Sequence, residues 1–203
     1  MALYSYTLTN ILVSVRAILA ETTASFWTDA ILTAYINEGQ RVIAERGGVY
    51  RTTKTVNTTN LVRTVSFTGY KCLAVEYNSK ALIKITPLQA GHTKLEDTGL
   101  VYPQYWFEYG AVIGIDPIPA DIYALTLYVA DIPTDLSSGT DTPSIPYAFC
   151  ELLTYYAVSR ALEQDKKYGA AMQLMSMFNN ELTFMSSALL PNVPSGIEDL
   201  RFQ

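Results

Sequence analysis

The spacing of apolar positions near the N-terminus predicts two helices. Between residues 9 and 20, apolar side chains recur every three or four positions, which places Ile11, Leu12, Val15, Ile18 and Leu19 on one helical face. A second pattern of similar period follows, with Thr28 or Asp29 as the residue that caps its first turn. Gly47 and Gly48 end this helix, because glycine adopts the left-handed conformation of a helix C-terminus without strain.

The period of the pattern changes to two from Val49 to about Thr134, which is typical of strands. Residues 105–115 read as one long strand in which the odd-numbered side chains share a face. The Pro-containing break at residues 116–120 joins it to a strand over residues 122–130, so the two runs predict a hairpin. Further strands are expected over residues 61–67, 72–77 and 81–86. The whole region predicts an antiparallel sheet or small sandwich of about five or six strands.

Two more helices are predicted after a polar linker at residues 135–144. Pro146 suits the first turn of the third helix, because its missing N–H costs nothing there. Residues 165–167 form the turn into the fourth helix. That helix carries a heptad seam, with the members Tyr168, Ala171, Met175, Phe178, Leu182, Met185 and Leu189. Two readings stay open: the seam packs within its own bundle, or it meets another subunit, with Met175 and Phe178 among the contacts.

The last residues, 191–203, contain two prolines and a glycine, which disfavour a regular helix at their start. They nevertheless carry the large apolar side chains Ile197, Leu200 and Phe202. This segment is therefore either a frayed terminus or an extended arm that docks these side chains onto a partner.

These elements predict an α+β protein with an inserted domain. Residues 1–48 and 142–190 form a helical bundle that holds both chain ends, and residues 49–134 form a β domain between them. Residues 191–203 are the expected arm. Four helices from the two ends can bury apolar stripes that either pair alone would leave partly exposed.

Aromatic side chains are densest at residues 105–109, Tyr-Trp-Phe-Glu-Tyr. In a strand, Tyr105, Phe107 and Tyr109 point to one face, and Trp106 points to the other. We expect the three-ring face to lie in the sheet core, and Trp106 to lie at a protein interface.

Charge and composition argue against several classes of protein. The 203 residues are 49% apolar and carry a net charge of −5, with no basic stripe of the kind that grips nucleic acid. The N-terminus does not read as a secretion signal, and the apolar runs are shorter than the ~20 residues that a membrane span needs. We therefore expect a protein made in a cytoplasm, with no membrane partner.

The sequence also lacks the signatures of catalysis, of cofactor binding and of metal binding. His92 is the only histidine, so no histidine pair can hold zinc, and no phosphate-binding glycine motif occurs. Cys72 and Cys150 read as buried apolar residues. Glu108, Asp116 and Asp121 lie along the predicted hairpin and could form an acid/base pair, but all three positions favour structural or solvated roles. The prediction is a protein that is not an enzyme and that has no cofactor, no metal and no catalytic residue.

Three stretches of the helical pattern resemble a known family. They are residues 11–19, residues 27–43 beginning Trp-Thr-Asp-Ala-Ile-Leu, and residues 145–171 beginning Ile-Pro-Tyr-Ala-Phe-Cys. Their order and character resemble the head-to-tail connector adaptor proteins of tailed bacteriophages, including the tubular tail protein A type of short-tailed phages. The resemblance covers the two helical segments, about half of the chain, and the β region matches only in position.

The resemblance implies a virion protein that forms a dodecameric ring between the portal protein and the next tail component, a nozzle or stopper. It assigns portal docking to Ile197, Leu200, Arg201 and Phe202, and it implies that DNA passes through the ring without specific binding. Two alternatives stay open. One is another tail-completion or decoration protein of the virion, and the other is a small-ligand-binding β domain on a helical support.

Overall fold

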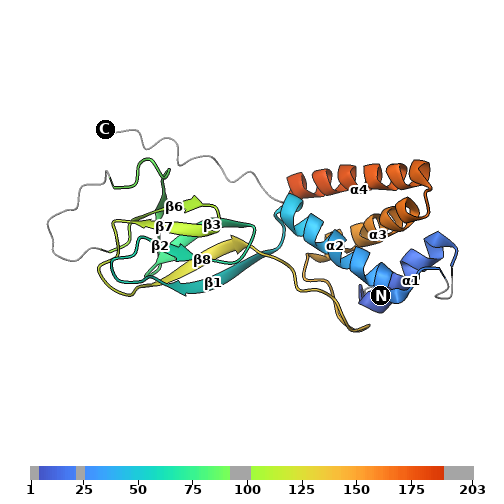
Figure 1. The fold of residues 1–203 in the computed structure, drawn as a ribbon, viewed down its shortest axis with the longest axis horizontal. Helices are drawn as coiled ribbons and strands as arrows, with labels where there is room; N and C mark the ends of the chain where they lie inside the picture. Colours follow the sequence, from blue (N-terminus) through green and yellow to red (C-terminus); the bar gives the residue numbers. More distant parts are fainter. Residues whose placement is uncertain (1–4, 22–25, 92–101, 190–203) are drawn as a thin grey trace. The chain divides into compact units, whose positions relative to one another are not determined.

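The computed structural model describes residues 5–21, 26–91 and 102–189. The chain forms two compact units, one made of Met1–Tyr50 with Pro133–Gln203 and the other of Arg51–Ile132. Helices make up the first unit and strands the second (Figure 1). The α+β class that the sequence predicts is therefore confirmed.

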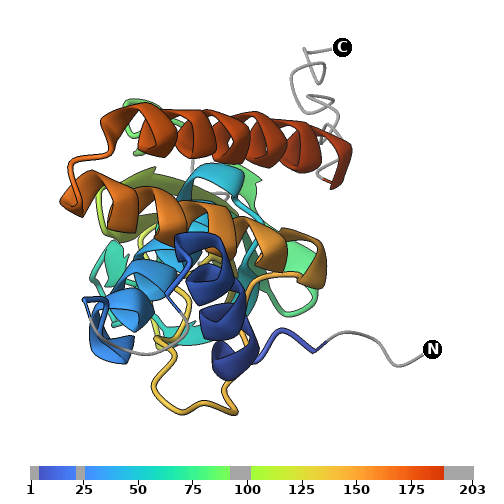
Figure 2. The same ribbon diagram turned by 90° about the vertical axis from the view of Figure 1, so that its right-hand side faces the viewer.

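The helical unit is organised around its third helix. The helices are α1 (Leu8–Leu19), α2 (Asp29–Gly47), α3 (Cys150–Gln164) and α4 (Tyr168–Leu189), with a short 3₁₀ turn (Tyr147–Phe149) before α3. α3 packs against each of the other three helices. Figure 2 shows α4 on one side of α3 and α1 on the opposite side. The two helices therefore offer their outer surfaces in different directions.

The ends of these helices follow the capping signals of the sequence. The Thr28 hydroxyl accepts a hydrogen bond from the Ile31 N–H at 3.3 Å and caps α2. Gly48 ends α2 with a φ of 58°, in the left-handed region that glycine adopts without strain. Lys166 lies in the predicted turn between α3 and α4. The four predicted helices are thus confirmed, and α1 begins at Leu8.

The polar segment that precedes α3 is bound to α2 and does not act as a loose linker. The Asn37 side chain donates to the Leu136 carbonyl at 3.0 Å and accepts from the Leu136 N–H at 2.8 Å. Gln40 donates to the Thr134 carbonyl at 2.8 Å and accepts from the Ser144 N–H at 2.9 Å. Two α2 amides therefore satisfy backbone groups that would otherwise lack partners, and they fix the segment to the helical unit.

The β unit is a sandwich of two four-stranded sheets within the described residues. Its strands are β1 (Arg51–Asn57), β2 (Thr64–Ser66), β3 (Lys71–Tyr77), β4 (Lys80–Ala81), β5 (Ile83–Lys84), β6 (Tyr105–Tyr109), β7 (Val112–Asp116) and β8 (Ala124–Ala130). One sheet has the order β1-β8-β3-β4 and the other β2-β7-β6-β5. All pairs are antiparallel except β5 with β6, which is parallel. The predicted sandwich has more strands than expected, because several are only two or three residues long.

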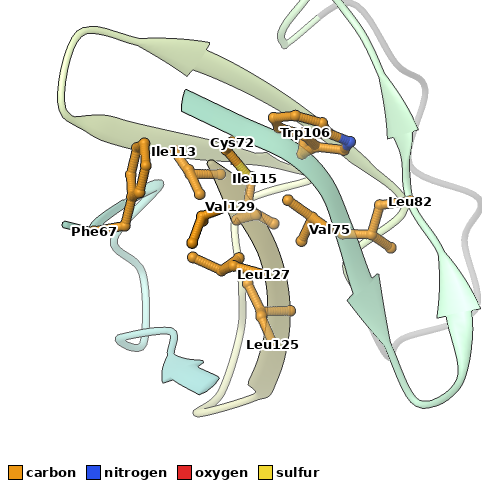
Figure 3. Packing of buried hydrophobic residues seen from close by; sticks show 10 residues of the cluster. All are labelled: Phe67, Cys72, Val75, Leu82, Trp106, Ile113, Ile115, Leu125, Leu127 and Val129. Atoms are coloured by element: carbon orange, nitrogen blue, oxygen red, sulfur yellow. The ribbon is translucent and has the colours of Figure 1, made fainter. Parts of the chain in front are cut away.

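Side chains from both sheets meet in a single apolar core (Figure 3). Its members are Phe67, Cys72, Val75, Leu82, Trp106, Ile113, Ile115, Leu125, Leu127 and Val129. Leu125, Leu127 and Val129 of β8 alternate with less buried residues, as expected for two sheets packed face to face, and a bulge in β3 brings both Cys72 and Val75 to the core.

The single long strand predicted over residues 105–115 is wrong. Gly110 has a φ of 61°, and Tyr109 pairs with Val112, so the chain reverses in a two-residue loop between β6 and β7. The predicted hairpin with residues 122–130 is also wrong, because β7 and β8 belong to different sheets. Residues 117–123 instead carry the chain from one sheet to the other.

This turn also reverses the predicted faces of the aromatic cluster. Cross-strand partners share a face of the sheet, and Trp106 pairs with Ile115, whereas Phe107 pairs with Gly114. Trp106 therefore points into the core and is 2% exposed. Phe107 lies on the other face, where its ring covers Gly114. The interface role expected for Trp106 does not agree with this burial.

Candidate protein interface on the helical unit

The carboxylates that the sequence offers for chemistry are held in structural contacts. Asp116 is buried and pairs with Arg63, with 3.3 Å between carboxylate oxygen and guanidinium nitrogen. Glu108 accepts a hydrogen bond from the Cys72 N–H at 2.9 Å, and its other oxygen lies 3.5 Å from the Lys84 ammonium. Among the residues that the structure describes, no group of three or more His, Cys, Asp or Glu side chains is placed to hold a metal.

Both cysteines lie in apolar surroundings, as the sequence predicts. Burial raises the pKa of the Cys72 thiol to about 12 and that of the Cys150 thiol to about 11. Both thiols therefore stay protonated near neutral pH, where the thiolate is the reactive form. His92 lies outside the described residues.

The heptad seam of α4 packs inside the helical unit. Ala171, Phe178 and Leu182 are buried, and the Phe178 ring lies 5.2 Å from the Tyr156 ring of α3, measured between centroids. Met175 is half-buried on the same side of the helix. The buried members favour the bundle reading of the seam, whereas Tyr168 at its start is 60% exposed. The contact with another subunit expected for Phe178 does not agree with its burial.

The outer surface of α4 nevertheless carries large apolar side chains. Met172 is 73% exposed and Phe184 is 72% exposed, and Met177 is also exposed. We call these three residues the α4 outer face. Glu181 is the one charged residue among the 22 of this helix. Met177 and Phe184 lie on one side of the helix and Met172 lies further round it. The exposed positions between them are polar but uncharged, namely Gln173, Ser176, Asn180, Thr183 and Ser187. This scarcity of charge is unusual for a helix that faces water, where charged side chains are the norm.

α1 has a similar outer surface. Val13 is 62% exposed and Ile18 is 50% exposed, and the small side chain of Ala17 is exposed between them. We call these three residues the α1 outer face. Arg16 is the one charged residue of α1, and it is buried, where it donates to the Trp27 carbonyl at 2.8 Å. The exposed surface of α1 is therefore entirely uncharged.

The other two helices show the ordinary pattern. Their charged residues are Asp29, Glu38, Arg41, Glu45 and Arg46 in α2, and Glu151, Arg160 and Glu163 in α3. Charged residues are depleted, and methionine and aromatic residues enriched, at the centres of protein–protein interfaces. The outer faces of α1 and α4 thus have the composition of an interface. A count of charges helix by helix would have indicated this from the sequence, and the sequence reasoning missed it for α1.

The β unit carries a smaller aromatic cluster on its surface. The rings of Tyr77, Tyr102 and Tyr123 contact one another, with centroids 5.3–6.1 Å apart. A shallow pocket beside them is lined by Lys80 and Gln104 among others.

The predicted portal-docking residues Ile197, Leu200, Arg201 and Phe202 lie outside the described residues. In the part of the chain that the structure does describe, no helix has both the length and the apolar character that crossing a membrane requires.

Comparison with known proteins gives one family. A family model described as SU10 adaptor protein matches residues 6–192 of the chain. No curated protein matches it. The match does not single out the tubular tail protein A type among adaptors, so that narrower resemblance stays a prediction.

Proposed function

We propose that this chain, which belongs to the SU10 adaptor protein family, forms a dodecameric ring that joins the portal of a bacteriophage to its tail. Membership makes the protein a structural adaptor of the phage virion. The ring, its place between portal and tail, and the next tail component, a nozzle or stopper, belong to the proposal.

The observation that carries this proposal is the extent of the family match. Residues 6–192 include nearly all of the helical unit and the whole of the β unit. The adaptor role therefore extends to both units, whereas the sequence resemblance covered the helical segments alone.

The surface of the helical unit supports the same conclusion. The α1 and α4 outer faces expose apolar side chains where a solitary protein would carry charge. The candidate carboxylates Asp116 and Glu108 are engaged in structural bonds. This arrangement favours contacts with other protein chains over chemistry on a substrate.

The charge of the chain suits a ring through which DNA passes. The net charge of −5 repels phosphate, and the sequence has no basic stripe that would hold a duplex in place. We therefore propose that DNA moves past the protein without specific binding.

Portal docking is proposed for the C-terminal residues Ile197, Leu200, Arg201 and Phe202, as the resemblance implies. A truncation before Pro191 should abolish docking while the circular dichroism spectrum keeps its helical signal. The matched control is the full-length chain with Asn192→Ala, a change beside the cut that removes no apolar anchor. If the truncated chain docks as well as this control, the assignment of the docking residues is wrong.

Electron microscopy of the protein mixed with purified portal rings tests the function itself. We expect added density, in the form of a ring, at one end of the portal. Labelled protein in intact particles should lie at the neck. A label on the capsid face or along the tail tube would instead identify a decoration or tail-completion protein, and would overturn the adaptor position.

A further inference from the structure

We propose that neighbouring copies of this chain contact each other through unlike surfaces, with the α1 outer face of one copy packed against the α4 outer face of the next. This inference rests on the proposed ring and assigns the surfaces that build it. The α1 outer face consists of Val13, Ala17 and Ile18, and the α4 outer face of Met172, Met177 and Phe184.

The first argument is the scarcity of charge on these two helices. Charged residues make up 16% of this chain, so helices of 12 and 22 residues would carry about five charges at the chain's own average. They carry two, Arg16 and Glu181, and Arg16 is buried. A scarcity of charged residues on a single helix has many explanations. The same scarcity on both α1 and α4 indicates that the two surfaces serve one function.

The second argument is the position of the two faces. α1 and α4 lie on opposite sides of α3, so their outer faces point away from each other (Figure 2). A foreign protein bound at one site needs a single patch. A subunit in a ring needs two different patches, because each copy contacts one neighbour with one surface and the other neighbour with the second. Two charge-poor faces with exposed large apolar side chains, on opposite sides of α3, therefore favour a second copy as the occupant.

The third argument is the fit between the side chains. The α1 outer face offers residues of modest size, and Val13 and Ala17 lie four positions apart and are therefore neighbours on the helix surface. The α4 outer face offers long ones, with Met177 and Phe184 seven positions apart and thus on one side of the helix. Large side chains of one helix pack into the spaces left by small ones on another, and methionine adapts to an uneven surface.

The size of the faces sets the strength of one contact. α1, with its 12 residues, is about 18 Å long, and a helix is only ~10–12 Å wide with its side chains. Such a strip is well short of the ~800 Å² that each partner buries in a stable pair. Isolated pairs are therefore weak, and the contact becomes secure only when a closed ring gives each copy two neighbours or when the portal holds the copies side by side.

Cysteine cross-linking of portal-bound protein tests the pairing. The double variant Val13→Cys with Phe184→Cys, treated with a flexible bismaleimide, should give a ladder of covalent multimers up to the full ring. Each single variant should give only monomers, because like faces do not meet. Glu45→Cys with Phe184→Cys is the matched control, since Glu45 is exposed on the charged surface of α2, and this pair should give no ladder. The native thiols stay silent because burial raises their pKa values.

Each outcome decides the question. A ladder from the first double variant alone supports the pairing of unlike faces. Dimers from either single variant, or an equal ladder from the α2 control, overturn it while the ring itself stands. Portal rings that bind the chain but yield no ladder also overturn it. Failure of the chain to bind portal at all contradicts the proposed function, which separates that failure from a wrong choice of surfaces.

A mixing experiment checks the direction of the contact with the unlinked chain. One variant carries Val13→Asp with Ile18→Asp, and the other carries Met177→Asp with Phe184→Asp. Neither variant by itself should form rings on portal. An equimolar mixture of the two should form dimers at high concentration, because each variant keeps one intact face. Dimers of either variant by itself would show that like faces meet, and would refute the proposal.

Discussion

Two phenylalanines of α4 separate a folding role from an assembly role. Phe178 is fully buried, with its ring 5.2 Å from that of Tyr156, and Phe184 is 72% exposed six positions further on. The same substitution to alanine therefore removes the same atoms from two very different surroundings. Phe178→Ala should weaken the fold, and Phe184→Ala should weaken assembly.

The structure sets the size of each effect. Deleting a buried phenylalanine side chain costs about 3–5 kcal/mol, since the lost transfer free energy adds to the cost of the cavity between α3 and α4. A domain of ordinary stability has only about 5–15 kcal/mol in total, so Phe178→Ala removes a large share. Phe184→Ala should change the free energy of unfolding by less than about 0.5 kcal/mol, because the exposed ring gains little on folding.

Urea unfolding followed by tryptophan fluorescence measures this difference. The chain has two tryptophans, Trp27 in the helical unit and Trp106 in the β unit, and both are buried. In a Trp106→Phe background, the signal comes from Trp27 and reports the helical unit. With an m-value of roughly 1–3 kcal/mol per molar urea, Phe178→Ala should lower the midpoint by at least about 1 M. The midpoint for Phe184→Ala should stay unchanged, while its rings on portal become fewer.

Two results would refute this reasoning. Equal destabilisation by both substitutions would mean that Phe184 is part of the monomer core. A Phe178→Ala chain as stable as its parent would mean that the seam of α4 does not pack on α3, and the reading of the heptad pattern as an internal contact would then fail.

The remaining predictions concern single contacts in each unit. Burial alone would raise the pKa of the Asp131 carboxyl, but hydrogen bonds, chiefly from Lys54, outweigh burial and hold that pKa below its usual 3.8. The stability that these bonds contribute is therefore present above about pH 4 and is lost as the pH falls through the lowered pKa. Thermal unfolding measured against pH should show this loss. Asp131→Asn should cost about 1.5–3 kcal/mol at neutral pH and remove this acid dependence. Gly114→Ala should lower the free energy of unfolding by roughly 1–3 kcal/mol, because the new methyl group meets the Phe107 ring. Gly169→Ala, in open helical surroundings, should raise it by up to about 1 kcal/mol. Urea unfolding measures both changes. Asn37→Leu should leave two backbone groups unpaired at roughly 1–3 kcal/mol each, and hydrogen exchange should quicken in the segment that this side chain binds.

The helices could be predicted because their signals are local. An apolar period of three to four residues, a threonine cap at Thr28 and a glycine stop at Gly48 lie within a few positions of the elements that they define. Partners of a strand are chosen over long distances, and alternation along one strand does not name them. β7 and β8 are close in sequence and lie in different sheets, and nothing between them distinguishes a crossing from a hairpin.

The turn at Gly110 shows why the aromatic faces came out reversed. Residues 105–115 are apolar on both sides, so the alternation runs through the loop without a visible break. A two-residue loop pairs odd positions of β6 with even positions of β7. The prediction was therefore off by one position in register. Because side chains alternate with a period of two residues, Trp106 was predicted at the surface but lies in the core.

The candidate interface could be predicted from the sequence only in part, and for a different reason. The sequence shows that α4 has a single charge, but Phe178 and Phe184 are both apolar, and only the contact with α3 decides which of them is buried. Sequence reasoning chose the heptad positions as possible contacts between subunits, since a regular seam is a strong signal. The structure uses the middle of that seam, at Ala171, Phe178 and Leu182, for the fold, and it exposes Met177 and Phe184, which repeat with the same heptad spacing on another side of the helix.

Exposed apolar surface is a risk for any chain made at high concentration, since large patches lead to aggregation. On α1 and α4 the exposed large apolar side chains lie on two narrow faces on opposite sides of α3, each too small to hold a pair of copies together. A weak contact of this kind delays assembly until many copies are brought together, and closure of a ring then gives each copy a second neighbour and ends growth without leaving an apolar face exposed. The free chain should therefore sediment as a monomer at micromolar concentration, and a stable dimer under those conditions would contradict the division of the interface into two weak halves.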